Sequence, residues 1–237
     1  MVSKMLLRSV AIAVLVLTGG AALSTRTVAR RPDRRPPPTQ KPQPIPGQFD
    51  YYMLTLSWSP DYCVGQGKRD PQQCGQGRQL GFVLHGLWPQ YTRGYPANCT
   101  TEAFDPQMRQ QFPNLYPSPR LYAHEWEKHG TCSGLTQAQY HQLAKTLKER
   151  VNLPDRYVRP QKPFRLTLAT LQHDFVQANP DFATNTIVPS CSGSGRFLQD
   201  MRVCFAKDGR AIACSEAVVR RSRTSCGQPN FLVRSVR

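Results

Sequence analysis

The sequence predicts a single α+β domain. Strand-like segments rich in aromatic and β-branched residues occur together with helix-like segments, and the two kinds do not follow a regular strand–helix–strand alternation. The chain of 237 residues, with 39% hydrophobic and 19% charged residues, has the composition of a folded protein. After residue 25 no apolar run approaches the roughly 18 residues needed to cross a bilayer, which excludes a multi-pass membrane protein.

The beginning of the chain has the pattern of a secretory signal. Lys4 and Arg8 precede the apolar residues 10–17, and small residues follow at 19–22. We therefore expect residues 1–29 to be a signal peptide, and its pattern is compatible with more than one cleavage position. An uncleaved single-pass anchor is the alternative.

A proline- and arginine-rich segment follows at residues 30–46. Proline at this density fixes φ and removes backbone donors, so we expect an extended tether without a packed core. A single domain is then expected at residues 47–237. The mature protein would be secreted or periplasmic, without a membrane segment.

Two strands are expected in the first part of the domain. Residues 49–58 are aromatic and β-branched with partial alternation, and residues 80–87 form an apolar run that places His85 at its end. The glycine and proline content of residues 89–99 indicates a loop.

The middle of the domain is expected to be helical. Gly130 would close one helix, the pair Thr136 and Gln139 resembles a capping box, and Pro180 would stop the last helix. The expected helices lie at residues 104–112, about 120–130, 136–151 and 166–178.

The tail is expected to return to strands. Residues 187–214 are strand-like, and Asp208-Gly209 at the centre of residues 207–210 supplies the positive φ that a tight hairpin turn requires.

Eight cysteines, an even number, all lie in the expected domain. The absence of any C-x-x-C pair disfavours zinc and dithiol redox sites. In an oxidising compartment these cysteines predict up to four disulfides, and spacing alone leaves on the order of a hundred pairings open.

The formal charge of the chain is +16, and residues 47–237 carry +9 of it. A basic domain favours a polyanionic partner through counterion release and long-range steering.

Two short motifs contain residues suited to acid–base chemistry. The first, F-V-L-H-G-L-W-P, contains His85 and Trp88. The second, H-E-W-E-K-H-G-T-C, spans residues 124–132. At about 3.6 residues per helical turn, one helix face would present His124, Glu125, Lys128 and His129.

This set of side chains fits cleavage of a phosphodiester. With a pKa of about 6.5, one imidazole can accept a proton while another donates one. An ammonium group can stabilise negative charge on a phosphoryl oxygen. No G-x-S-x-G motif offers a nucleophile, so the nucleophile would belong to the substrate, as the 2′-hydroxyl of RNA does.

Plainer interpretations of the same residues exist. The zinc motif H-E-x-x-H fails because Lys128 stands where the second histidine belongs. A charged helix face can be merely solvated, and a lone histidine or tryptophan is more often structural than functional. His141 and His173, outside any charged cluster, are expected to be structural or surface residues.

The two motifs resemble the active-site signatures of the ribonuclease T2 family of acid endoribonucleases. They match in order and separation, and the likeness extends from residue 49 through Cys226. The resemblance implies a mainly antiparallel central sheet flanked by helices and stapled by disulfides. It also implies metal-independent cleavage of single-stranded RNA with little base specificity, without a cofactor and without DNA cleavage, by a monomer.

The resemblance also implies roles for individual residues. His85 would protonate the departing 5′-oxygen and His129 would take the 2′-hydroxyl proton, giving 2′,3′-cyclic phosphates and then 3′-phosphates. His124 would hold the phosphate, and Glu125 and Lys128 would support the transition state. Base-site contacts would come from Trp88, Tyr95 and Gln90.

The implied disulfides are Cys99–Cys132, a nested Cys191–Cys226 and Cys204–Cys214, and, by subtraction, Cys63–Cys74. Two other classes of function stay open at this point. One is a basic secreted RNA-binding or cytotoxic protein whose turnover is incidental. The other is a periplasmic module that binds carbohydrates or polyanions.

Overall fold

A computed structural model describes residues 43–67 and 69–236 of the chain. The expected signal peptide, at residues 1–29, and most of the expected tether lie outside the described residues, so both stay predictions. Among the described residues, no helix is long and apolar enough to cross a membrane.

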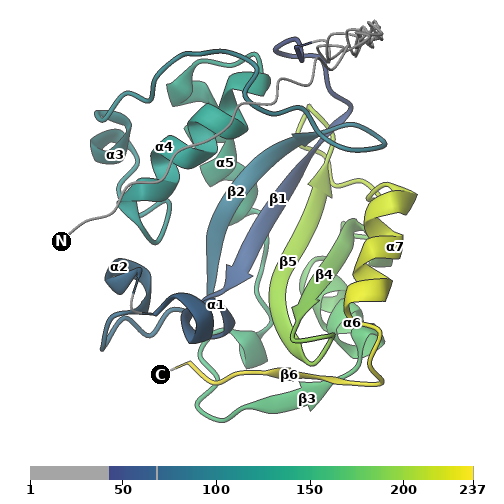
Figure 1. The fold of residues 1–237 in the computed structure, drawn as a ribbon. Helices are drawn as coiled ribbons and strands as arrows, with labels where there is room; N and C mark the ends of the chain where they lie inside the picture. The colour runs from purple at the N-terminus through teal and green to yellow at the C-terminus, as the bar shows by residue number, and fades with distance from the viewer. Residues whose placement is uncertain (1–42, 68, 237) are drawn as a thin grey trace, which may run out of the picture. The chain divides into compact units, whose positions relative to one another are not determined.

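A six-stranded sheet is at the centre of the fold, as Figure 1 shows. All its strand pairs are antiparallel except a single parallel pairing between Phe197 of β5 and Leu232 of β6. With the flanking helices, this arrangement confirms the predicted α+β class. The strands run in the order β2 (Phe82–Gln90), β1 (Tyr51–Trp58), β5 (Phe197–Phe205), β6 (Phe231–Val233) and β3 (Phe164–Leu166), and β4 (Ile187–Ser192) also pairs with β5.

Both faces of β1 are buried, and the alternation of its side chains divides the core in two. Leu54, Leu56 and Trp58 belong to the larger apolar cluster. Tyr51 and Met53 point to the opposite side, where a smaller cluster includes Val218 and Val219 of α7. We call this second side of the sheet the α7 face.

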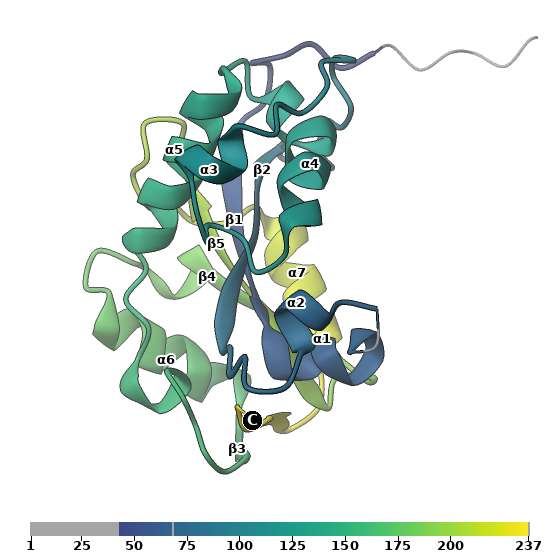
Figure 2. The same ribbon diagram turned by 90° about the vertical axis from the view of Figure 1, so that its left-hand side faces the viewer.

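Helices cover both sides of the sheet. α5 (Gln137–Glu149) contacts β1 and β2, whereas β4 lies between α6 (Leu168–Ala178) and α7 (Glu216–Ser225). Figure 2 shows α6 and α7 on opposite sides of the strands. The smaller helices are α1 (Ser59–Gln66), α2 (Pro71–Cys74), α3 (Met108–Gln111), η2 (Asp155–Tyr157) and η3 (Thr184–Thr186).

The helix boundaries follow local chemistry where a cap is present. Thr136 and Gln139 form the predicted capping box at the start of α5, and Thr167 caps α6 by accepting from the backbone N–H of Thr170. α4 (Pro119–Lys128) begins with proline, whose missing N–H costs nothing in the first turn. A short 3₁₀ turn, η1 (Gly130–Cys132), follows it.

Several expected boundaries were wrong. β2 continues to Gln90, so His85 lies within the strand rather than at its end, because Leu87 to Gln90 still pair with β1. The turn around Asp208-Gly209 leads only to an isolated bridge between Phe205 and Ala211, whereas the long hairpin joins β4 and β5. The helix expected at residues 104–112 is reduced to α3.

Four disulfides staple the domain and use all eight cysteines. Their pairing is the one that the family resemblance implied. Two close short segments, with sequence separations of 10 and 11, and two join segments 33 and 35 residues apart. The pairs are Cys63–Cys74, Cys99–Cys132, Cys191–Cys226 and Cys204–Cys214.

Candidate active site

A β-bulge in β2 directs the side chain of His85 to the α7 face. Thr55 of β1 pairs with Gly86 and Leu56 pairs with Leu84, so His85 is an extra residue between two paired positions. Without the bulge, strict alternation would place His85 opposite to Trp88. With it, the two rings meet edge to face, with 5.3 Å between their centroids.

The end of α4 brings the second motif to the same place. Trp126 anchors the helix in the larger apolar cluster and donates through Nε1 to the Glu102 carbonyl oxygen. Glu125 is fully buried, Lys128 is the last helical residue, and His129 follows as the buried C-cap residue. The buried anchor thus fixes which face of α4 meets β2.

Glu125, from the second motif, contacts residues of the first. Its Oε2 accepts a 2.8 Å hydrogen bond from Trp88 Nε1, and its Oε1 is 3.9 Å from His85 Nε2. Burial raises the pKa of Glu125 to about 8, against the opposing effects of the Trp88 hydrogen bond and the Lys128 charge. Its carboxyl group therefore holds a proton at neutral and mildly acidic pH and can donate a hydrogen bond.

Gly86 makes this approach possible. A Cβ atom at this position would stand 1.8 Å from Glu125 Oε2 and 2.4 Å from Trp88 Nε1. Any larger residue would have to displace the carboxyl group or the indole ring.

His129 stacks on Trp88 with a centroid distance of 5.2 Å and an interplanar angle of 28°. Burial, and then the nearby Lys128, His124 and His85, lower the pKa of His129 to about 3. The imidazole is therefore neutral over the physiological range. Its Nδ1 is buried and has no hydrogen-bond partner among the residues that the structure describes.

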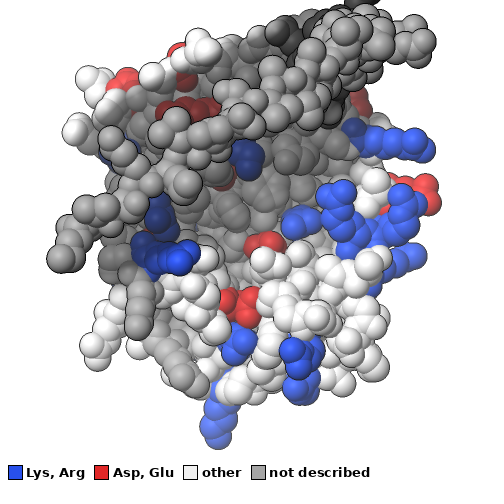
Figure 3. All heavy atoms as spheres, viewed as in Figure 1, with Lys and Arg blue, Asp and Glu red and all other residues white. Residues whose placement is uncertain are grey.

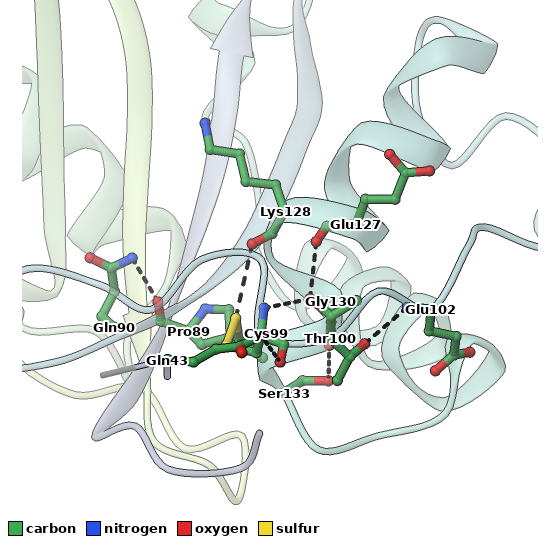
Figure 4. Close-up of a disulfide and its surroundings, with 12 residues drawn as sticks. Gln43, Pro89, Gln90, Cys99, Thr100, Glu102, Glu127, Lys128, Gly130 and Ser133 are labelled. Carbon is green, nitrogen blue, oxygen red and sulfur yellow. Dashed lines mark hydrogen bonds between the residues drawn. A yellow bond between two sulfur atoms is a disulfide. The ribbon is translucent and has the colours of Figure 1, made fainter. Parts of the chain in front are cut away.

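Lys128 and His124 complete the polar set on α4. His124 is exposed on the helix, and burial of part of its ring, with the charge of Lys128, lowers its pKa. The Lys128 carbonyl oxygen accepts from the Asn98 N–H at 2.9 Å, next to the Cys99–Cys132 disulfide. Figure 4 shows the Lys128 side chain pointing away from this disulfide, so the cross-link holds the backbone and leaves the ammonium group free of it.

Three further residues reach the site from the centre of the sheet. Ser57 Oγ lies 3.0 Å from His85 Nδ1 and donates a 2.7 Å hydrogen bond to Asp200 Oδ1. Arg202 Nη2 is 3.7 Å from Asp200 Oδ2. Ser57 lies in β1, and Asp200 and Arg202 lie in β5. Sequence reasoning missed these residues because neither β1 nor β5 carries an active-site motif, and only the pairing of the two strands brings them to His85.

The predicted base-site residues differ in their accessibility. Trp88 is half-buried and Tyr95 is 52% exposed, with its ring 6.1 Å from that of His129. Gln90 is only 5% exposed, and its amide group donates to the Pro89 carbonyl oxygen. Trp88 and Tyr95 therefore offer aromatic surface at the site, whereas Gln90 is turned inward.

The two remaining histidines lie apart from this cluster. His141 is fully buried among aromatic rings, and burial lowers its pKa to about 4, whereas His173 is exposed on α6. Over residues 43–67 and 69–236, no group of three or more His, Cys, Asp or Glu side chains could hold a metal ion.

Comparison with known proteins identifies the class to which this fold and this site belong. The Ribonuclease T2 family model matches residues 49–214, and the chain belongs to this family. The chain is therefore an endoribonuclease, and RNA is its substrate.

Particular relatives support this membership along most of the domain. The chain is 46% identical over 202 residues to a ribonuclease of Aeromonas hydrophila. The matched region covers 81% of this chain and 88% of that protein. It is 35% identical over 121 residues to a probable ribonuclease of Haemophilus influenzae, covering 45% and 44% of the two chains.

Solved structures share the fold at lower sequence identity. Trichomaglin, an S-like ribonuclease, superposes with a TM-score of 0.59 at 24% identity, covering 70% of this chain and 92% of its own. A mutant of RNase MC1 superposes with the same TM-score at 22% identity, covering 77% and 97%.

Proposed function

We propose that this endoribonuclease cleaves single-stranded RNA by transphosphorylation, with little base specificity and without a metal ion or cofactor. The 2′-hydroxyl oxygen attacks the adjacent phosphorus and the bond to the 5′-oxygen breaks. The product is a 2′,3′-cyclic phosphate, which water then opens to a 3′-phosphate. DNA lacks the nucleophile and is not a substrate.

The observation that carries this mechanism is the unequal environment of two histidines around one buried carboxyl group. His129, with its pKa lowered to about 3, is neutral and can take the 2′-hydroxyl proton. Burial also lowers the pKa of His85, but the Asp200 charge opposes this effect and favours the charged ring, an opposing charge that His129 lacks. We assign to His85 the role of the acid that protonates the departing 5′-oxygen.

The remaining polar groups stabilise the charge that develops on the phosphoryl oxygens. Lys128 does so by its positive charge, and the protonated Glu125 can donate a hydrogen bond from the carboxyl oxygen that has no partner among the described residues. His124, exposed on the same helix, would hold the phosphate.

Base binding would use stacking, because Trp88 and Tyr95 present aromatic surface beside His129. Any base has a π-face, so this contact discriminates weakly. Gln90 would take part only after its amide group leaves the Pro89 carbonyl oxygen.

We further propose that the domain is exported as a monomer and acts outside the cytoplasm. The basic and apolar pattern of residues 1–29 and the four disulfides support an oxidising compartment. Residues 30–46 would then be a tether that takes no part in the chemistry.

The test is digestion of mixed RNA by the purified protein at mildly acidic pH in the presence of EDTA. The native protein should release 2′,3′-cyclic ends, and His129→Ala should lose at least about a hundredfold in rate. His173→Ala, an exposed histidine on α6, is the matched control and should retain native activity.

Loss of all cleavage in EDTA would overturn the metal-independent mechanism. Full activity of His129→Ala would overturn the role of that histidine. RNA that is bound but never cleaved by the native, disulfide-bonded protein would favour a binding function instead.

A further inference from the structure

The two ring nitrogens of His85 face different partners. Nε2 lies 3.9 Å from Glu125 Oε1, on the side where the phosphate would bind. Nδ1 lies 3.0 Å from Ser57 Oγ, which in turn donates to Asp200 Oδ1 at 2.7 Å. These hydrogen bonds, which we call the Asp200–Ser57–His85 relay, thus join β5, β1 and β2 behind the imidazole ring.

The number of hydrogen atoms available in the relay determines which ring nitrogen of His85 carries the proton. A serine hydroxyl has one hydrogen, and Ser57 gives it to the Asp200 carboxylate. Ser57 can therefore offer only a lone pair to His85, so Nδ1 must be the donor in their hydrogen bond. The neutral ring is then the Nδ1–H tautomer, with its lone pair on Nε2.

We propose that Ser57 and Asp200 are positioning residues that hold His85 in the Nδ1–H tautomer, with Nε2 toward the cleaved bond, and that stabilise its charged form. This proposal rests on the proposed function, in which His85 is the acid that protonates the 5′-oxygen. Neither residue touches the substrate, because both lie behind the ring. Their effect on the reaction passes through His85.

The sheet gives the relay a rigid geometry. Ser57 and Asp200 are opposite each other in the register of β1 and β5, and both residues are buried, with 7% of each exposed. The bulge of β2 puts His85 on this face but leaves it without a register partner, so strand pairing does not fix the rotation of its ring. The hydrogen bond to Ser57 therefore supplies the constraint that the bulge removes.

The surroundings of His85 disfavour its charged form, which the relay would stabilise. Burial has the largest effect and lowers the pKa of His85, and the charges of His124 and Lys128 on α4 and of Arg202 on β5 lower it further. Glu125 carries a proton and adds no negative charge at the pH of the reaction. The Asp200 charge acts in the opposite direction and favours the charged form of His85.

The test measures kinetics and the His85 tautomer in the full chain. Asp200→Asn and Ser57→Ala should each lower kcat on the order of tenfold to a hundredfold with KM within about twofold. The double variant should lose no more than the worse single one, because both act through one chain of hydrogen bonds. Ser57→Thr keeps the hydroxyl group and should retain most of the rate.

The pH profile and the nitrogen spectrum distinguish positioning from a purely structural role. Without Asp200, His85 should lose its proton at lower pH, so the alkaline limb of the kcat profile should move to lower pH. Nitrogen-15 NMR should show protonated Nδ1 and unprotonated Nε2 in neutral His85 of the native protein. Asp200→Asn should shift this ring toward the other tautomer. Comparison with a His85→Ala spectrum assigns the signals.

Thr55→Val is the matched control. Thr55 lies two residues before Ser57 on the same face of β1, and its buried hydroxyl has no partner within the described part of the chain. Loss of this hydroxyl should leave the rate, the pH profile and the His85 spectrum unchanged.

Native kcat in both single variants, or a neutral His85 that carries its hydrogen on Nε2 in the native protein, would overturn the proposal. If the native enzyme releases no cyclic phosphate, the proposed function fails instead. In that case the nitrogen-15 measurement of the His85 tautomer still tests the relay, because this measurement does not depend on activity.

Discussion

Glu125 couples the stability of the fold to the protonation of the site. Its pKa is raised from 4.5 to about 8, so above pH 4.5 the folded chain holds a proton that the unfolded chain has released. Stability from this group is therefore lost as pH rises through 8. His129 acts in the opposite sense, because its lowered pKa costs stability as pH falls from 6.5 toward about 3.

The first prediction concerns the contribution of Glu125 between its unfolded pKa of 4.5 and its folded pKa of about 8. Relative to Glu125→Gln, the native protein should lose up to about 1.4 kcal/mol of unfolding free energy per pH unit in this range. Urea unfolding at several pH values measures it. The control is Glu127→Gln, the exposed neighbour on α4, which should keep the native slope. A native slope in Glu125→Gln would contradict the assignment.

The second prediction concerns Gly86. Gly86→Ala should push Glu125 away from Trp88, because the new Cβ atom would overlap Oε2. We expect kcat to fall at least about tenfold, with roughly 1–3 kcal/mol lost in stability. Steady-state kinetics and urea unfolding measure both quantities.

Gly65→Ala is the matched control for this change. Gly65 lies in α1, where an added Cβ atom meets nothing within 4 Å, so its activity should stay native. Native activity in Gly86→Ala would show that the contact between Glu125 and Trp88 has no part in catalysis.

At the scale of elements, the junction of α4 with the loop after β2 determines the site. The Cys99–Cys132 disulfide and the hydrogen bond from Asn98 to the Lys128 carbonyl oxygen hold this loop against the end of the helix. The sequence predicted both motifs but could not show that a bulge reorients His85. A bulge depends on the register of two strands, which no local pattern records.

The third prediction concerns this cross-link. Replacing Cys99 and Cys132 with serine should cost roughly 2–5 kcal/mol in stability and should also lower kcat, because the end of α4 loses its restraint. Replacing Cys63 and Cys74 should lower stability and leave kcat native, since this disulfide joins only α1 and α2. Urea unfolding and kinetics well below the unfolding transition separate the two effects. Equal kcat in both double variants would contradict the prediction.

At the scale of the whole molecule, basic side chains gather beside the site. The exposed residues Arg220, Arg221 and Arg223 lie on α7, and Figure 3 shows lysine and arginine side chains concentrated over this helix. The pKa of Arg202 is lowered by burial and, among other causes, by the charge of Arg221, which places α7 within electrostatic reach of the relay. This surface can attract an RNA strand beyond the cleaved bond.

The fourth prediction tests that surface. Changing Arg220, Arg221 and Arg223 to glutamine should lower kcat/KM on long RNA at low salt. It should also reduce the slope of log kcat/KM against log salt by up to about 2. Cleavage of a dinucleotide should change little, because its single phosphate is the one that is cleaved and no further phosphate is left for α7.

The matched control removes three charges elsewhere. Arg159, Lys162 and Arg165 are exposed near β3, and their change to glutamine should leave the slope close to native. An equal effect of both triple variants would show that net charge, rather than α7, attracts the RNA.

The sequence by itself determined the class of fold, the capping box of α5 and the two motifs that hold His85 and residues 124–129. These features depend on local composition and on spacing along the chain, which helix periodicity and side-chain chemistry make readable. Helix α7 and the short strands β3 and β6 were not predicted, because they lie in short segments whose pattern is weak.

Only the tertiary structure decided how the motifs meet. The raised pKa of Glu125 and the lowered pKa of His129 arise from burial between β2 and α4, and burial is a property of packing rather than of sequence. Ser57 and Asp200 reach His85 because β1 pairs with β5 across 143 residues of chain. Strand pairing between distant segments is cooperative and leaves no local signal, so these residues could be found only in the folded molecule.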